Sequence, residues 1–450
     1  MTTTTQTLAA LAEQMVSRAQ ALGATGADAL AMEADAFQVQ VRLGEVENTT
    51  GARDKGIGLR VFHGHRQASA STSDFSPEGV ERLVQDTVAL ARLTEEDPFS
   101  GLADPQPLTE FPELDLDDGG TDLSMDQRID LALRAERAAM DADPRINNSE
   151  GASFDSSRGL VAYANSNGFS GSFHTSSYGL SAVPVATDGE GMQRDYWFSS
   201  RRHLADLENP EAVGAEAARR VLRRLGARKV STCEVPIVFD RQMASGLLGH
   251  LVSATSGNAI YKGASFLADR IGGRVLPEGM DVIDDPLRPR GLGSRPFDGE
   301  GVACSRLELV SGGILKSYLL DSYAARKLSM TTTGSASRGL GGSPAPSSSN
   351  CYLAPGSHDP EAIIASVERG LYVTELIGFG VNGVTGDYSR GAAGMWIENG
   401  ELAFPVEEVT ISGNLLDMYA AIEMVGNDLD FTRRVTAPTL KVGRMTLAGD

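Results

Sequence analysis

The sequence predicts an α+β protein: an N-terminal domain of antiparallel sheet with segregated helices, followed by a β-rich C-terminal domain. Two observations predict this fold class. Residues 146–202 are rich in Ser, Gly, Tyr and Phe with alternating polarity, and Asn167-Gly168 inside this stretch is a strong hairpin signal. Helical patterns flank such strand-rich stretches instead of alternating with single strands, which favours antiparallel pairing over a doubly wound parallel sheet.

The elements of the first domain follow from local spacing and capping signals. Residues 8–22 are Ala-rich with helical spacing, residues 36–46 alternate as a strand, and residues 56–73 offer a strand pair. Three further helices are predicted by their N-terminal signals: Ser76-Pro77, the capping box Ser124-x-x-Gln127 with a helix to Ala142, and Asn209-Pro210 with a helix ending at Gly226.

Residues 227–234 are predicted to separate two domains, residues 1–226 and residues 235–450. The second begins with a strand at 235–239 and a short apolar helix at 244–254. Asp359-Pro360 predicts a helix that closes at Gly370, and Asn399-Gly400 predicts a hairpin. Residues 331–350 are almost entirely Thr, Gly, Ser, Ala and Pro, and a loop of this length is usually functional or disordered.

Composition excludes several classes of function. The 450 residues include 40 Lys and Arg against 60 Asp and Glu, a net charge of −20, so we expect no nucleic-acid partner. The basic cluster at residues 219–229 is interpreted as a solvated helix end. The three cysteines show no metal or disulfide spacing, and no signal peptide or spanning segment is visible. We therefore expect a soluble, cytoplasmic protein without a membrane partner.

Two short motifs carry weak functional signals. Gly378-Phe379-Gly380-Val381-Asn382-Gly383 matches GxGxxG, but the residues that follow are loop-like instead of helical, so we interpret it as a Gly-rich turn between strands. His63-x-His65 would place two imidazoles on one face of a strand, but no third ligand is near in sequence. The six histidines are scattered, and the sequence alone nominates no catalytic triad.

The segment from Thr385 to Gly394 is the strongest candidate for a binding loop. Its glycines permit positive φ and close approach of a backbone. Asp387 and Arg390 either pair with each other, or Arg390 holds a peptide carboxylate bidentately. Both interpretations stay open at the level of sequence.

Several segments together resemble one protein family. They are Gly44 to Asn48, Ala70 to Pro77, Ile146 to Gly151, Gly246 to Val252, Ser322 to Leu328, Thr385 to Gly394 and Ile411 to Leu415. Through them the chain resembles the TldD/PmbA family, the modulator-of-gyrase peptidases, and specifically the PmbA (TldE) branch, over nearly its whole length. The resemblance implies a heteromeric metallopeptidase that acts on unfolded or extended peptides. The gyrase name does not imply DNA binding.

The resemblance also implies where this chain departs from a catalytic subunit. TldD chains of the family look to hold zinc through His-Glu-x-x-x-His and a C-terminal cysteine. Here the three key motif positions are Gly249, His250 and Ala254, and the cysteine region near residues 425–428 has no Cys. The expectation is no metal or other cofactor in this chain, zinc in a TldD-type partner, and substrate contacts from Asp387, Tyr388 and Arg390.

Two other hypotheses remain beside that of a non-catalytic subunit. The chain is alternatively a stand-alone peptide-binding or scaffold homodimer without protease activity. It is otherwise an independent peptidase in which His250 acts with Glu or Asp ligands supplied by the fold. In any of these cases an extended substrate is expected to join a sheet edge in the β-rich second part through backbone hydrogen bonds.

Overall fold

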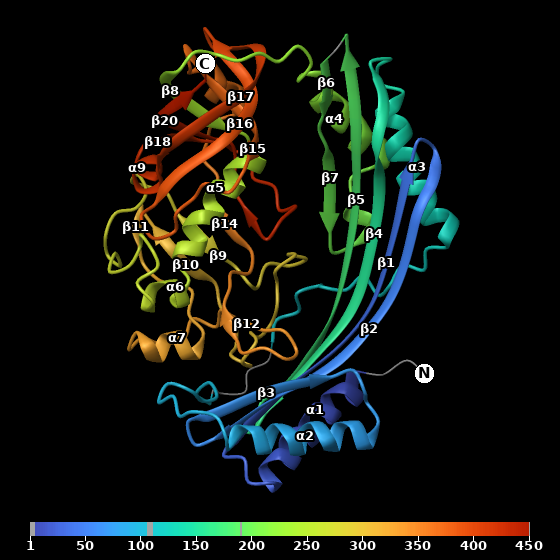
Figure 1. The fold of residues 1–450 in the computed structure, drawn as a ribbon, viewed down its shortest axis with the longest axis vertical. Coiled ribbons are helices and arrows are strands. Elements are labelled where there is room, and N and C mark those ends of the chain that lie inside the picture. Colours follow the sequence, from blue (N-terminus) through green and yellow to red (C-terminus); the bar gives the residue numbers. More distant parts are fainter. Residues whose placement is uncertain (1–4, 106–110, 190, 450) are drawn as a thin grey trace.

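The fold centres on one long, curved sheet in the N-terminal half, against which the C-terminal half packs (Figure 1). The computed structural model describes residues 5–105, 111–189 and 191–449. The mixed content of helix and strand, with few and segregated helices, confirms the predicted α+β class.

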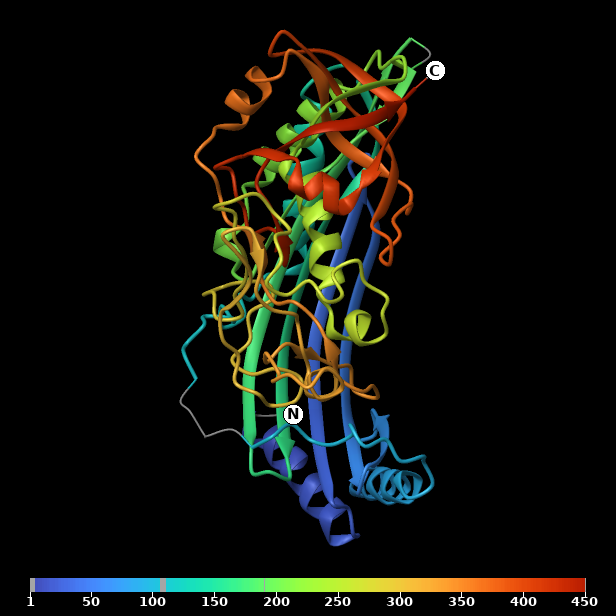
Figure 2. The same ribbon diagram turned by 90° about the vertical axis from the view of Figure 1, so that its left-hand side faces the viewer.

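The long sheet is antiparallel throughout, with the order β3-β2-β1-β4-β5-β6 and with β7 also paired to β5. Its strands are β1 (Gly26–Arg42), β2 (Glu45–His63), β3 (Arg66–Thr72), β4 (Ile146–Asn165), β5 (Ser170–Asp188), β6 (Gly191–Arg194) and β7 (Trp197–Arg201). Strands of up to 20 residues span about 65 Å at ~3.3 Å per residue, and Figure 2 shows them running along most of the molecule's height.

Two pairs of helices cover different ends of this sheet (Figure 1). Helices α1 (Thr5–Ala21) and α2 (Pro77–Ala91) bury Leu8, Met15 and Val84 against one end. Helices α3 (Met125–Met140) and α4 (Pro210–Leu222) cover the other end; a short 3-10 turn, Leu204–Asp206, precedes α4. Ser76 caps α2, and Ser124 and Gln127 make the predicted capping box at α3.

The C-terminal half contains a sheet that closes on itself. Its order is β17-β16-β15-β8-β20-β18, and β17 also pairs with β20. The strands are β8 (Cys233–Phe239), β15 (Arg369–Ile377), β16 (Asp387–Glu398), β17 (Glu401–Asn414), β18 (Ile422–Val425) and β20 (Leu440–Ala448). Helix α5 (Arg241–Ala254) directly follows β8 and packs its apolar face into the core of this half.

Smaller elements complete the C-terminal half. A second sheet has the order β11-β10-β9-β14-β19, and β12 pairs with β13. The remaining strands are β9 (Val282–Asp284), β10 (Leu307–Ser311), β11 (Ile314–Leu315), β12 (Ala336–Ser337), β13 (Ala345–Pro346), β14 (Cys351–Leu353) and β19 (Val435–Thr436). The remaining helices are α6 (Gly257–Tyr261), α7 (Ser322–Lys327), α8 (Pro360–Ala365) and α9 (Leu415–Ala420).

The structure corrects three local predictions. The strand expected at residues 36–46 begins earlier, at Gly26, and ends at Arg42, where Leu43 and Gly44 turn with positive φ. The helix expected to close at Gly370 ends at Ala365. Gly370 instead lies in β15, where a Cβ would stand 2.6 Å from the carbonyl oxygen of Pro236, because β15 runs alongside β8.

The third correction concerns the basic cluster at residues 219–229, which is not simply a solvated helix end. Arg220 is buried, and its Nε and Nη1 lie 3.3 Å and 3.4 Å from carboxylate oxygens of Asp195 and Asp240. Asp240 is also the N-cap of α5. This arginine therefore ties α4 of the first half to the start of α5 in the second.

The segment 331–350 lies against the long sheet. Leu340 packs so closely on β2 that a Cβ at Gly58 would stand 1.6 Å from its carbonyl oxygen. Ser343 accepts a hydrogen bond from Gln67, and Arg338 pairs with Asp28. Within the described ranges, no helix is long and apolar enough to cross a membrane.

Candidate functional site at helix α5 and strand β16

Helix α5 carries the positions at which the family resemblance places a zinc motif. Asp240 caps it by accepting a hydrogen bond from the Met243 amide. Its apolar side chains, Leu247, Leu248, Leu251 and Val252, are buried in the core. The opposite face carries Gly246, Gly249, His250 and Ser253, the i, i+3, i+4, i+7 spacing of one helix face.

The three motif positions do not fit a zinc ion. Gly249 has no side chain, and a Cβ built there would meet no atom within 4 Å. Ala254 is buried and offers no donor atom. Zinc sites in proteins take three or four Cys, His or carboxylate ligands. In the part of the chain that the structure describes, no three such residues are grouped to hold a metal ion.

The segment expected to carry the family's cysteine is committed to the fold. Gly426 donates its amide to the carbonyl of Thr439. The carboxylate of Asp428 accepts hydrogen bonds from the Thr439 amide and hydroxyl, at 2.9 Å and 2.8 Å. Asp428 is the one carboxylate among residues 425–428. Its hydrogen bonds hold the segment after β18 against the start of β20.

His250 lies against the face of β16 that carries Tyr388 and Arg390. The rings of His250 and Tyr388 meet edge-on with their centroids 6.0 Å apart. Burial lowers the pKa of His250, and the positive charge of Arg390 lowers it further. The imidazole is therefore neutral at physiological pH, the opposite of the anionic carboxylate that a general base of a zinc peptidase provides.

Tyr388 and Arg390 each carry a buried hydrogen-bond donor without a partner among the described residues. They share one face of β16 because they stand two residues apart. Tyr388 is buried, and burial raises its pKa to about 12. Arg390 donates from Nη2 to the carbonyl of Leu376 at 3.2 Å. Among the described residues, the Tyr388 hydroxyl and the Arg390 Nε are buried without a hydrogen-bond partner.

Asp387 does not belong to this group. It is exposed on the other face of β16, and its carboxylate accepts a 2.6 Å hydrogen bond from the Thr385 hydroxyl. Arg390 turns to Leu376 instead of pairing with Asp387. Of the three residues predicted to contact substrate, the structure thus brings Tyr388 and Arg390 together with His250, and places Asp387 apart from them.

Of the two weak motifs, the Gly-rich turn pairs with the start of β16 through Val381 and Tyr388, and the two histidines lie elsewhere. Residues 378–383 form the turn between β15 and β16, and a strand instead of a helix follows, in agreement with the interpretation as a Gly-rich turn. His63 and His65 flank the turn at Gly64 between β2 and β3. His65 Nδ1 lies 3.1 Å from the carbonyl oxygen of Ser100.

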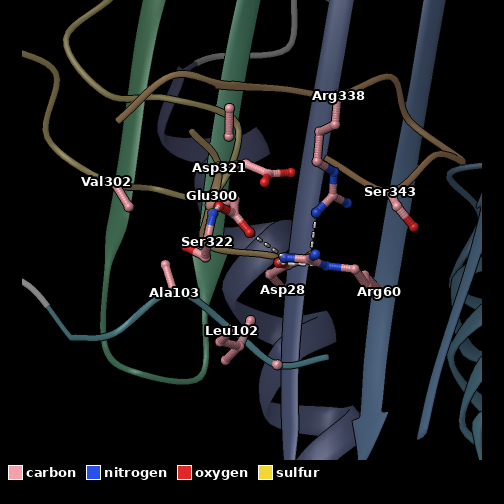
Figure 3. Close-up of polar contacts among 12 residues, drawn as sticks. Asp28, Arg60, Leu102, Ala103, Glu300, Val302, Asp321, Ser322, Arg338 and Ser343 are labelled. Carbon is pink, nitrogen blue, oxygen red and sulfur yellow. Dashed lines mark hydrogen bonds and ion pairs between the residues drawn. The ribbon is translucent and has the colours of Figure 1, made fainter. Parts of the chain in front are cut away.

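Sequence reasoning missed a buried charge cluster between the two halves (Figure 3). Asp28 of β1 pairs with Arg60 of β2 and with Arg338, while Glu300 lies 3.7 Å from Arg60. Tyr163 donates its hydroxyl to Asp28 at 3.2 Å. Burial alone would raise the pKa of Asp28, but the two arginines outweigh it and hold this pKa below its usual value. No local sequence signal links these five positions.

Known metallopeptidases match this chain along its length. Three models of the PmbA/TldA metallopeptidase match the chain: domain 1 over residues 27–91, the central domain over 118–225, and the C-terminal domain over 232–449. The chain is 41% identical to the Metalloprotease PmbA of Escherichia coli O157:H7, over 97% of this chain and 96% of that protein. The chain belongs to the PmbA/TldD metallopeptidase family, which confirms the resemblance read from the sequence.

Other relatives match most or all of the chain. A Metalloprotease PmbA homolog of Haemophilus influenzae is 38% identical over 92% of this chain and 90% of its own length. A crystal structure of a protein from Bacteroides thetaiotaomicron, described as a modulator of DNA gyrase, superposes with a TM-score of 0.91 at 28% identity and covers 100% of both chains.

Proposed function

We propose that this chain is the non-catalytic subunit of a cytoplasmic, heteromeric metallopeptidase that degrades or processes unfolded and extended peptides. A TldD-type partner supplies the zinc and the catalytic groups. The observation that carries the proposal is the composition of the α5 face. Gly249, His250 and Ala254 offer one imidazole where a zinc peptidase needs several ligands and a carboxylate.

The proposal assigns substrate contacts to the His250 face. The unpartnered donors of Tyr388 and Arg390 suit the acceptors of a peptide, and Arg390 suits an acidic group in particular. Leaving such buried donors unpaired costs free energy, which a bound acceptor recovers. Asp387, predicted from sequence as a third contact, joins a peptide only from the exposed, opposite face of β16.

The topology changes where an extended peptide would add to a sheet. In the C-terminal half β17 pairs with both β16 and β20, and the edge strands that remain among the described residues, including β18, β11 and β19, are short. In the long sheet, β3 pairs only with residues 57–63 of β2. Residues 45–55 of β2 are exposed and pair with β1 on one side. We place backbone pairing with substrate on this stretch.

Metal analysis of the chain purified alone, without chelator or metal-binding tag, tests the assignment of zinc to the partner. We expect near-zero zinc in this chain, and ~1 zinc per TldD-type chain in the reconstituted complex. Peptidase activity should need both chains. Tightly held zinc at ~1 per chain in this protein alone, or full activity without a partner, would overturn the proposal. Absence of any complex, with peptide binding by a homodimer, would favour the scaffold alternative.

Arg390→Met tests the substrate contact. The lost charge-assisted hydrogen bond, about 1.5–3 kcal/mol, predicts a KM for an acidic peptide raised roughly tenfold or more, with kcat nearly unchanged. Arg444→Met is the matched control, because Arg444 is a mostly exposed arginine of the same sheet. Equal KM values for the Arg390 variant and the unmodified complex would remove Arg390 from the binding site.

A further inference from the structure

A cavity of about 280 Å³ lies between the long sheet and the C-terminal half, away from the α5 site. One wall is apolar and includes Leu30, Met32, Phe173 and Phe297. The remaining wall carries four arginines, Arg202, Arg295, Arg338 and Arg434. Four cations around one small cavity are costly to bury unless anions or acceptors face them.

The guanidinium groups keep unused donors in the cavity wall. The side chain of Arg338 is fully buried, and only its Nη1 is paired, with Asp28 (Figure 3). Among the described residues, Arg338 Nε and Nη2 and Arg295 Nε are buried without a hydrogen-bond partner. An unpaired charged donor costs more than a neutral one, so these three nitrogens mark a place for acceptor atoms.

Arg202 adds a cation that forms no ion pair with a carboxylate among the described residues. It is 9% exposed, and it donates to the backbone carbonyls of Ser176, Gly291 and Leu292 at 3.1, 3.2 and 2.7 Å. Burial lowers its pKa to about 10, and the positive charge of Arg434 contributes. Arg202 and Arg434 therefore repel each other across this wall, and an anion between them would relieve that repulsion.

The carboxylates near the cavity are already engaged. Asp28 is shared between Arg60 and Arg338. Asp298 accepts three backbone amides: those of Glu300 and Val302 on Oδ1 and that of Ala336 on Oδ2. Among the described lining residues, four arginines stand against one carboxylate, Asp298, so the charge of the wall favours an anion over an ammonium group.

We propose that this cavity binds a small carboxylate that carries an apolar group, with the carboxylate on the arginines and the apolar group against Phe173 and Phe297. The apolar wall disfavours inorganic phosphate, and the excess of arginines over carboxylates disfavours the ammonium group of a free amino acid. Two sources share this chemistry: the C-terminal residue of a peptide and a free organic acid. The volume is near the lower end of ligand pockets, about 300 Å³, and suits one residue. This inference does not depend on the proposed peptidase complex.

Calorimetric titration of the full chain with N-acetyl-L-leucine and N-acetyl-L-leucinamide tests the site. The two probes differ only in the terminal carboxylate, and we expect the amide to bind at least tenfold more weakly. Two further probes distinguish the two sources: 4-methylpentanoate represents a free organic acid, and a pentapeptide whose last residue is leucine represents a chain end. Binding of the peptide places a chain end in the cavity, while binding of only the small acids assigns a free organic acid.

Two variants report on the arginines without requiring activity. Arg338→Lys keeps a cation for Asp28 but removes the free Nε and Nη2, and Arg295→Met removes the other free Nε. Each should weaken binding of N-acetyl-L-leucine at least tenfold, measured at a temperature at which circular dichroism shows the variant folded, because Arg338 belongs to the buried charge cluster and its variant is expected to melt lower. Arg306→Met, a half-exposed arginine paired with Glu308 outside the cavity, should bind normally. Equal binding of acid and amide, unchanged affinity in both variants, no binding of any probe, or equally tight binding of inorganic phosphate would overturn the proposal.

Discussion

The imidazole of His250 packs edge-on against the ring of Tyr388, with 6.0 Å between centroids and 72° between planes. This contact joins helix α5, where the resemblance in sequence places a zinc motif, to strand β16, where the sequence predicted substrate contacts. The result is a neutral, partly aromatic surface flanked by Arg390. Under the proposed function this surface binds and orients a peptide, and the described residues group no three ligands there to hold a metal and activate water.

We predict that His250→Ala leaves kcat of the reconstituted complex within about twofold of the unmodified value. The neutral ring of His250 supplies packing and contact area, and no proton transfer is assigned to it. Steady-state kinetics with a fluorogenic peptide measures both kcat and KM. Loss of all activity in this variant would instead favour an independent peptidase built around His250.

Much of the fold follows from local signals because those signals act within a few residues. The capping box at Ser124 and Gln127, the N-cap at Ser76 and the turn at Asn399-Gly400 each satisfy backbone groups nearby, and each is observed. Helix α5 likewise follows from its own apolar spacing. The error at Gly370 has the opposite origin, since the backbone of Pro236, more than a hundred residues away, decides its environment.

The parts that could not be predicted depend on distant residues. Closure of the C-terminal sheet pairs Thr410 with Ala448, and the charge cluster joins Asp28 to Arg338. The unexpected burial of Arg220 depends on Asp195, between β6 and β7, and on Asp240, the N-cap of α5. At the candidate site, spacing along β16 placed Tyr388 and Arg390 on one face, but only the fold shows that His250 faces them.

A pair of glycine substitutions tests how segment 331–350 is held on the long sheet. In Gly58→Ala the new Cβ would meet the Leu340 backbone at 1.6 Å, so the segment must move away. We expect faster limited proteolysis within residues 331–350 and a lower melting temperature. Gly249→Ala is the matched control, because a Cβ there meets nothing within 4 Å and alanine favours an exposed helix by roughly 0.5–1 kcal/mol. Equal protease resistance of the two variants would contradict this account of the segment.

The buried charge cluster predicts that replacing the Asp28 carboxylate with an amide lowers the free energy of unfolding strongly. Asp28→Asn leaves Arg60 and Arg338 buried with one fewer anion, and breaking a buried pair typically costs about 3–5 kcal/mol. Glu308→Gln at the half-exposed pair with Arg306 should cost at most about 1 kcal/mol. Urea unfolding of both variants gives the two free energies. A cost below that of Glu308→Gln would mean that the cluster does not stabilise the contact between the halves.

The pH dependence of stability should be governed by three buried carboxyl groups with raised pKa values. Burial, together with Glu300, raises the pKa of Asp298 to about 7, and burial raises the pKa values of Asp284 and Asp321 to about 6. Between pH 4 and these values the folded chain holds protons that the unfolded chain has released. The free energy of unfolding therefore falls as pH rises from about 4 to 7.

Burial also raises the pKa values of Asp155 and Asp240, which act in the same direction as these three groups. The remaining groups act outside this window or against it. The pKa of Asp28 is lowered, so its contribution is lost only at pH values below about 4. The lowered pKa of His250 makes stability rise with pH up to about 6.5, but it is one group against several. Melting temperatures from pH 4.5 to 8 measure the sum, and we expect a downward slope to about pH 7. Asp298→Asn should flatten the upper part of that slope, although it loses a hydrogen bond at every pH. A melting temperature that rises steadily over this range would show that the three carboxyl groups ionise normally in the folded chain.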